Sequence, residues 1–190
     1  MMTAPLSKID VAVALIRNIS DRRTHPSGEE LALLDRMVNQ AAKMNELVGK
    51  SFRGAYYALA GDFEQARECH KEAIQACPQI PSVYFNYSVT LSRFKRYEEA
   101  TEMALKAVVL SGGAPNHVHA LLMNAYWSDA HEILERWLPF YEKTTGQPHP
   151  VAGWLEEDAQ DEAEIMHMVK QVPNGRPTLI DTLKNKLGFA

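Results

Sequence analysis

The stretch from Lys50 to Ser82 constrains the fold of this chain most, because it contains one complete helical hairpin. Gly61 and Asp62 interrupt a first helical run. Four residues then recur with helical spacing on one face of a second helix: Phe63, Ala66, His70 and Ala73. Pro78 ends that helix, since its ring has no N–H to donate and clashes with the preceding turn. A similar pattern returns after about 34 residues, so the sequence predicts an array of helical hairpins.

Composition and charge narrow the class of protein. The chain has 190 residues, of which 46% are hydrophobic, and this is enough for a packed core. Its formal net charge of −4 argues against a nucleic-acid partner, because such proteins carry a basic stripe. No run approaches the roughly 18 apolar residues of a membrane span, and residues 1–20 lack the apolar centre of a secretion signal. We therefore expect neither nucleic acid nor a membrane as a partner.

The two cysteines indicate a reducing compartment. Cys69 and Cys77 are eight residues apart on one predicted helix, about 12 Å along its axis. A disulfide needs Cα atoms within about 7 Å of each other, so both thiols are expected to stay reduced. Reduced cysteines are typical of a cytoplasmic protein, and this is the location that the sequence predicts.

Two capping boxes predict helices ahead of the hairpins. Ser7 with Asp10 forms the first box, and Ser27 with Glu30 forms the second. The apolar spacing that follows predicts helices over residues 8–19 and 29–44. Neither helix carries the small-residue pattern of the hairpins, so residues 1–46 are expected to form an N-terminal cap.

Small and aromatic residues make the hairpins comparable with a known family. In residues 47–80 they are Gly54, Tyr57, Gly61, Phe63, Ala66, Ala73 and Pro78. In residues 81–114 they are Tyr84, Ser88, Tyr97, Ala100 and Ala107. The pattern resembles the tetratricopeptide repeat (TPR) family, although His70 replaces an aromatic residue, Lys95 the turn glycine and Gly112 the closing proline. The resemblance implies an all-α, TPR-like helical-hairpin solenoid with N- and C-terminal capping helices.

A third, degenerate hairpin is predicted from spacing alone. Residues 112–116 break the chain, and helices are expected over 117–127 and 129–144, with Pro139 kinking or restarting the second one. Residues 47–146 would then hold the TPR-like repeats. Residues 147–190 would hold a linker, an acidic helix and a C-terminal amphipathic helix, with the linker composition covering residues 145–153.

The resemblance also implies a binding surface. TPR arrays bind an extended peptide or a helix on the concave surface that the first helix of each hairpin lines. Carried over by register, this groove contains Ser51, Ala55, Leu59, Phe85, Val89, Ser92, Arg93, Asn116, His119, Met123 and Trp127. Arg93 would take a carboxylate or a backbone carbonyl of the ligand.

One ligand known from the family is not expected here. Some TPR proteins hold the C-terminal carboxylate of a chaperone with Lys, Asn and Arg side chains on this surface. The corresponding positions carry Ser51, Ala55, Asn86, Asn116 and Ala120, of which only Asn86 matches. The sequence therefore predicts no carboxylate clamp.

A second candidate surface lies after the linker, at Trp154, Leu155, Glu156, Glu157 and Asp158. An acidic run is most simply a solvated helix face, but the aromatic residue beside it favours a docking helix. Thr178 and Asp181 form a third capping box, before a short amphipathic helix that ends at Leu187. That helix has the right size to fill the groove itself.

No residue pattern in the chain names a reaction. Phosphate loops, nucleophile elbows and zinc-helix motifs are missing from the sequence, and His117 and His119 point to opposite sides of a helix. We therefore expect no enzyme, no catalytic residue, no metal site and no cofactor. The predicted function is a non-catalytic protein–protein interaction module, an adaptor or chaperone-like protein whose partner is another protein. The alternative is an antitoxin-like or immunity protein that blocks a partner enzyme with its acidic C-terminal arm. Homo-oligomerisation stays open.

Overall fold

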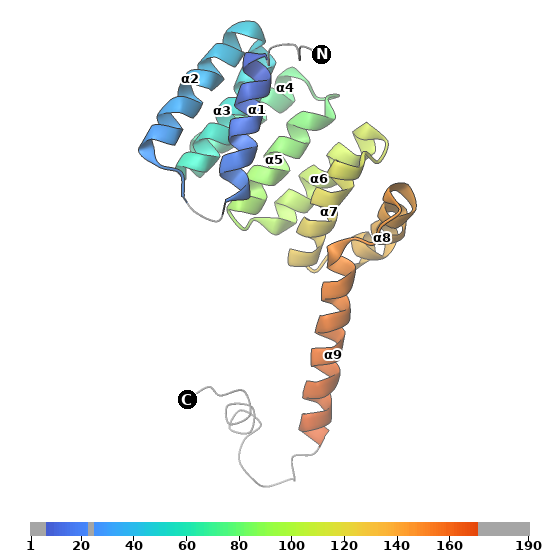
Figure 1. The fold of residues 1–190 in the computed structure, drawn as a ribbon. Coiled ribbons are helices and arrows are strands. Elements are labelled where there is room, and N and C mark those ends of the chain that lie inside the picture. The colour runs from blue at the N-terminus through green and yellow to red at the C-terminus, as the bar shows by residue number, and fades with distance from the viewer. Residues whose placement is uncertain (1–6, 23–24, 171–190) are drawn as a thin grey trace, which may run out of the picture. The chain divides into compact units, whose positions relative to one another are not determined.

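The computed structural model describes residues 7–22 and 25–170, and these residues form nine α-helices and no strand (Figure 1). The chain divides into two compact units, Met1–Gln147 and Pro148–Ala190. The helices of the first unit are α1 (Lys8–Asp21), α2 (Gly28–Met44), α3 (Glu46–Ala60), α4 (Phe63–Ala76), α5 (Pro81–Arg93), α6 (Tyr97–Ser111), α7 (Pro115–Trp127) and α8 (His131–Thr145). The second unit contains α9 (Pro150–Lys170).

Both predicted capping boxes are confirmed. The Ser7 hydroxyl accepts a hydrogen bond from the Asp10 amide at 3.1 Å, and the Asp10 carboxylate accepts one from the Ser7 amide at 3.0 Å. Ser27 and Glu30 make the same reciprocal pair at the start of α2, at 3.2 and 2.8 Å. Each box satisfies amides that have no partner inside the helix, and this is why the two helices begin where they do.

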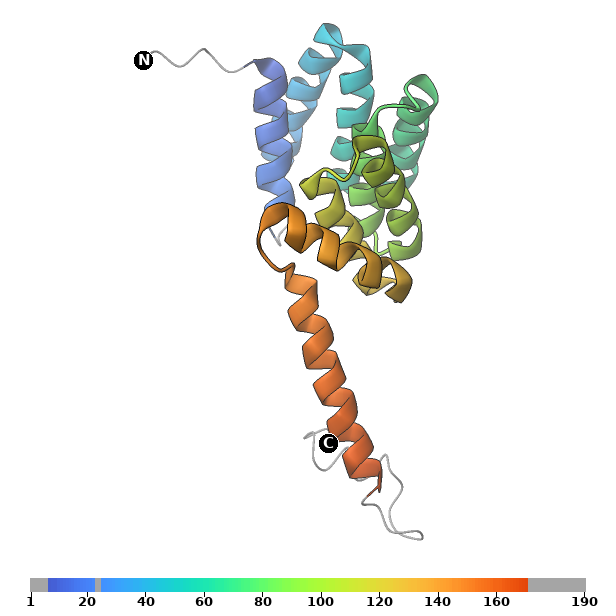
Figure 2. The ribbon, with the colours of Figure 1, turned by 90° about the vertical axis from the view of Figure 1, so that its right-hand side faces the viewer.

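Successive helices of the first unit pack against each other in chain order, so α3–α4, α5–α6 and α7–α8 form three hairpins (Figure 2). Each hairpin turn contains one residue with a left-handed backbone: Gly61, Lys95 and Asp129, with φ of 86°, 58° and 57°. These residues follow one another at intervals of 34. Only the first is a glycine, so the turn geometry recurs even at Lys95, whose side chain disfavours it. The all-α, TPR-like helical-hairpin solenoid is therefore confirmed.

Small residues let the paired helices approach closely, as the sequence predicts. A Cβ atom on Gly54 of α3 would lie 2.6 Å from the His70 ring of α4, closer than real Cβ atoms come to any neighbour. The alanines at the matching places of α4 and α6 are fully buried: Ala66, Ala73, Ala100 and Ala107. Replacing any of them by a larger residue would force the helices apart, because protein interiors are close-packed.

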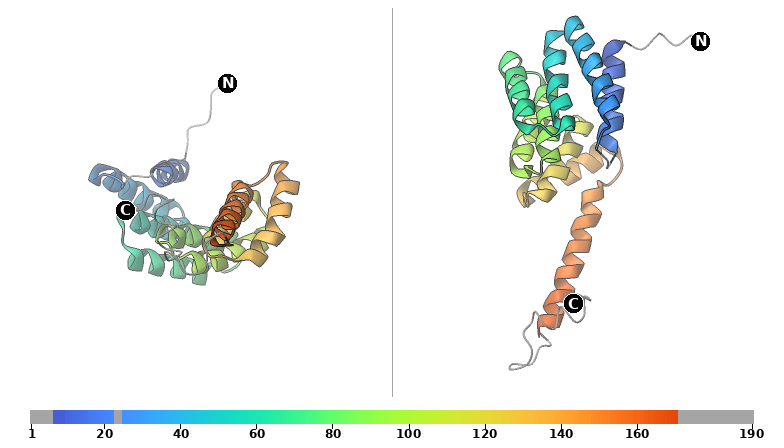
Figure 3. Two further views of the ribbon diagram at one scale, coloured as in Figure 1. Left: turned by 90° about the horizontal axis from the view of Figure 1, so that it is seen from below. Right: turned by 90° about the vertical axis from the view of Figure 1, so that its left-hand side faces the viewer.

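The first helix lies on the inner side of the helical array. Seen from below, α2 to α8 follow a curve, and α1 lies within it (Figure 3, left). Ile19 of α1 is buried in one cluster with Leu34 and Val38 of α2 and Leu59 of α3. This shared core fixes α1 against α2 and α3, and it places the opposite side of α1 toward the interior of the curve.

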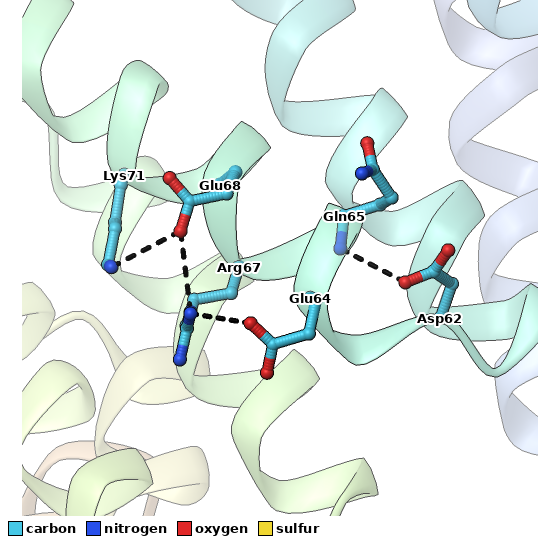
Figure 4. A network of polar contacts seen from close by, with 6 residues as sticks. All are labelled: Asp62, Glu64, Gln65, Arg67, Glu68 and Lys71. Carbon is cyan, nitrogen blue, oxygen red and sulfur yellow. Dashed lines mark hydrogen bonds and ion pairs between the residues drawn. The ribbon is translucent and has the colours of Figure 1, made fainter.

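The outer face of α4 is a surface of short-range ion pairs (Figure 4). Asp62 caps the helix by accepting a hydrogen bond from the Gln65 amide at 3.1 Å. Arg67 pairs with Glu64 at 2.5 Å and with Glu68 at 3.4 Å. Lys71 pairs with Glu68 at 3.3 Å. Pairs of this kind support a helix by a few tenths of a kcal/mol each, which accounts for the charges on this face without any ligand.

One expectation about the later helices is wrong, and of the two alternatives given for Pro139, a kink or a restart, the restart is excluded. Residues 150–153, predicted as part of a linker, form the first turn of α9, and Pro150 suits this position because the first turn does not need its missing N–H. The helix α8 does not restart at Pro139 but runs through it to Thr145. Pro139 is exposed, so the carbonyl that loses its intrahelical donor can be hydrated by water. The third capping box and the helix that ends at Leu187 lie outside the described residues.

Candidate partner-binding site

The inner side of the first unit contains a pocket of about 370 Å³, here called the inner pocket. Its walls come from α1, α3 and α5, with one residue from α7. The lining residues are Val13, Ile16, Arg17, Ser20, Ser51, Phe52, Ala55, Ala58, Leu59, Phe85, Asn86, Val89, Thr90, Arg93 and Asn116. Most of these side chains are apolar. One wall is therefore a helix outside the hairpins, and the other two are the first helices of successive hairpins.

A second pocket of about 660 Å³, here called the adjoining pocket, shares a wall with the first. It is lined by Arg17, Phe85, Val89, Ser92, Pro115, Asn116, His119, Ala120, Met123, Asn124 and Tyr141. The residues common to both pockets are Arg17, Phe85, Val89 and Asn116. The two pockets together form a continuous surface along α3, α5 and α7, and their volumes lie in the range of ligand sites.

The structure brings together every residue that was predicted for the groove except Trp127. Trp127 is the last residue of α7 and is 55% exposed. Its ring stacks on Tyr97 of α6, with the ring centroids 5.9 Å apart, in a separate hollow beside the turn between α5 and α6. The repeat register of the hairpins predicted that Trp127 lies in the groove with Leu59 and Arg93. The contact of Trp127 with Tyr97 of the preceding hairpin instead directs its ring away from the inner surface.

Sequence reasoning missed the contribution of α1 to this surface. Val13, Ile16, Arg17 and Ser20 all line the inner pocket. The apolar spacing of this helix, which includes Val13 and Ile16, was interpreted only as the packing face of an N-terminal cap. In the structure Val13 stays 39% exposed, so part of that spacing faces the pocket and not the core.

Hydrogen bonds across the pocket floor join two successive hairpins. The Asn86 side-chain amide of α5 donates to the Ser51 hydroxyl of α3 at 2.7 Å. The Arg93 Nε donates to the Ala58 carbonyl at 3.2 Å, again from α5 to α3. Asn86, the one residue that matches the carboxylate clamp, is thus bonded within the chain. Arg93 also uses Nε inside the protein, and its remaining N–H groups can still act as donors to a ligand.

Burial lowers the pKa of each of the three histidines near this surface. His70 is fully buried, its Nε2 lies 2.8 Å from the Thr90 hydroxyl, and burial lowers its pKa to about 4. Burial also lowers the pKa of His117, whose ring lies 4.9 Å from that of Phe85, and the pKa of His119. All three rings are consequently neutral at pH 7, so they add no positive charge to the surface there.

Neither cysteine is part of the two pockets. Cys69 and Cys77 are both free, and Cys77 is the C-cap of α4, one residue past its end. Burial raises the pKa of the Cys69 thiol, which makes it a poorer nucleophile. Among the residues that the structure describes, no group of three His, Cys, Asp or Glu side chains could hold a metal ion. Over the same residues, none of the helices has the length and apolar character needed to span a bilayer.

The second candidate surface lies on α9. Trp154 and Leu155 are half-buried in the second turn of this helix, whereas Glu156, Glu157 and Asp158 are exposed. This segment contributes an acidic surface more than an apolar one.

The first unit thus has the class of fold in which helical hairpins surround a lined inner surface, and three known proteins resemble the chain in sequence. The mitochondrial import receptor subunit TOM70 of Rattus norvegicus and that of Mus musculus are each 33% identical over 111 residues, and that of Homo sapiens is 32% identical over 120. The alignments cover 56–58% of this chain but only 16–17% of each receptor subunit, so the chain spans about one-sixth of their length. No family model and no solved structure matches the chain.

Proposed function

We propose that this chain is a non-catalytic protein–protein interaction module, an adaptor or chaperone-like protein, that binds a peptide or helix of a partner in the inner and adjoining pockets. The observation that carries the proposal is the exposed apolar lining of these pockets. Val89 keeps 44% of its surface exposed at their shared wall. Apolar side chains left exposed in a concave surface are typical of interaction sites.

The similar proteins support the same reading. Their name describes a receptor subunit for import, and a receptor acts by binding. The chain spans one-sixth of their length, so the support extends to binding alone and not to a role in mitochondria. The proposal includes a cytoplasmic location, which rests on the two free cysteines.

Paired valine substitutions test the proposal. Val89→Gln places a polar group in the shared wall, and Val109→Gln makes the same change on α6, where Val109 is 68% exposed and outside both pockets. Each tagged protein is purified from the native cell, and the bound proteins are quantified by mass spectrometry. We expect Val89→Gln to lose at least one specific partner that Val109→Gln retains. Identical partner sets would contradict the assignment of binding to the pockets.

A second candidate function is that of an inhibitory protein that blocks an enzyme with α9. It is favoured by the exposed carboxylates Glu156, Glu157 and Asp158, and by the location of α9 in a separate compact unit. Replacing these three residues by Gln, Gln and Asn keeps the helix and removes the charge. A partner enzyme that binds the wild type but not this variant, while tolerating Val89→Gln, would favour this function over the first.

A further inference from the structure

We infer that the segment bound in the inner pocket is an acidic amphipathic segment of another protein, and that Arg17 of α1 takes one of its carboxylates. This inference rests on the proposed function and adds the chemistry of the partner. It concerns carboxylates on side chains along the ligand, not the carboxylate at the end of a chain.

The first observation that supports an acidic ligand is the charge of the pocket lining. Among the described residues that line the two pockets, none is an aspartate or a glutamate, whereas Arg17 and Arg93 are both present. The chain as a whole has four more acidic than basic residues, so this local positive charge runs against the average. A basic lining without carboxylates attracts an anionic segment and disfavours a cationic one.

The second observation is the position of Arg17. Its side chain is exposed, lines both pockets, and makes no ion pair with any residue that the structure describes. Of the other described arginines, four pair with a carboxylate of the chain, namely Arg22, Arg53, Arg67 and Arg96. Arg36, Arg93 and Arg136 form no ion pair with a described residue, and of these Arg93 also lines the inner pocket. An arginine left unpaired at the junction of two pockets is well placed to bind a carboxylate of a ligand.

The third observation is the arrangement of the walls of the inner pocket. Arg17 comes from α1 and Arg93 from α5, and the apolar side chains of Phe52, Leu59 and Val89 complete the same pocket. A segment with one apolar side can bury that side against these residues while its carboxylates reach the arginines. A helix that presents apolar residues at i, i+3 and i+4, flanked by glutamates, has this geometry.

Two synthetic peptides test the inference. Both are fluorescently labelled, about 14 residues long or roughly four helical turns, and share the same leucine positions. At the charged positions, one peptide has only glutamate and the other has only lysine. Their binding to the full chain is measured by fluorescence anisotropy at low and at high salt. We expect the glutamate peptide to bind at least tenfold more tightly, with a difference that shrinks in high salt as the charges are screened.

Substitutions at Arg17 assign the preference to this residue. Arg17→Gln should weaken the glutamate peptide about fivefold, and Arg17→Glu should narrow or invert the difference between the two peptides. Arg36→Gln is the matched control, because Arg36 is an exposed arginine on α2 that lines neither pocket. Arg36→Gln should leave both affinities unchanged.

The outcomes separate this inference from the proposed function. The inference of an acidic ligand would be contradicted by any of four results: equal binding of both peptides, tighter binding of the lysine peptide, binding of neither peptide, or no effect of Arg17→Gln. If Val89→Gln still loses its cellular partner in those cases, the interaction module stands. Sedimentation of the full chain tests whether the acidic segment is instead α9 of a second copy of this chain. A dimer abolished by Arg17→Gln would assign the pocket to that helix and overturn a partner of different sequence.

Discussion

His70 shows how one residue can keep a repeat while changing its chemistry. The histidine stands where the TPR pattern has an aromatic residue, and its ring still packs as one, stacked on Tyr87 with the ring centroids 5.3 Å apart. Its Nε2 is within hydrogen-bonding distance of the Thr90 hydroxyl, whereas its buried Nδ1 has no partner among the described residues. The sequence placed His70 where the repeat has an aromatic residue, but it could not predict the missing partner, because hydrogen bonds at Nδ1 depend on contacts distant in sequence.

This burial makes the free energy of unfolding depend on pH. The pKa of His70 is about 4 in the folded chain and near 6.5 when unfolded. The unfolded state therefore binds more protons between these values, and stability falls as pH decreases from 6.5 to 4. Each pKa unit corresponds to 1.36 kcal/mol, so the loss should reach about 3 kcal/mol. Urea unfolding at several pH values measures it.

The variant His70→Leu keeps the volume and removes the titrating group. We expect its stability to decrease with falling pH by about 3 kcal/mol less than that of the wild type. His25→Leu serves as the control, because His25 is exposed. A wild type and a His70→Leu variant with the same pH dependence would show that His70 is protonated in the folded chain as easily as in the unfolded one.

At the scale of helices, local sequence signals predict where a helix begins and ends better than they predict which other helices it packs against. The capping boxes at Ser7 and Ser27 and the turn at Gly61 depend on residues a few positions apart, so they could be read directly. Lys95 and Asp129 also adopt the left-handed turn. The 34-residue period placed Lys95 at the turn position, whereas Asp129 was expected to begin a helix that in the structure begins at His131. The place of α1 could not be predicted, because its apolar stripe shows that it packs but not against which helix.

The packing of α1 can be tested through Ile19. This side chain is buried to 1% exposure among residues of α2 and α3. Ile19→Ala should lower the free energy of unfolding by about 3 kcal/mol, since it removes buried methyl groups and leaves a cavity. Val11→Ala, at a position that is 39% exposed on the same helix, should cost well under 1 kcal/mol. Equal losses in urea unfolding would mean that α1 does not pack as described.

At the scale of the molecule, the inner surface is a product of several helices. The register of the hairpins correctly predicted that residues such as Ser51, Phe85 and Asn116 lie together. It could not predict that α1 would supply Arg17, or that Trp127 would stack on the neighbouring hairpin, because both depend on packing between separate segments. The proposed function depends on this assembled surface and not on any single motif.

Site-specific photo-crosslinking in the native cell tests the central claim most directly. A benzophenone amino acid is placed at Val89, in the shared wall of the two pockets, or at Val109, which is more exposed but lies outside them. We predict that irradiation gives a discrete adduct with another protein from position 89 and none from position 109. The same adducts from both positions, or an adduct from position 109 alone, would contradict a partner-binding site on the inner surface.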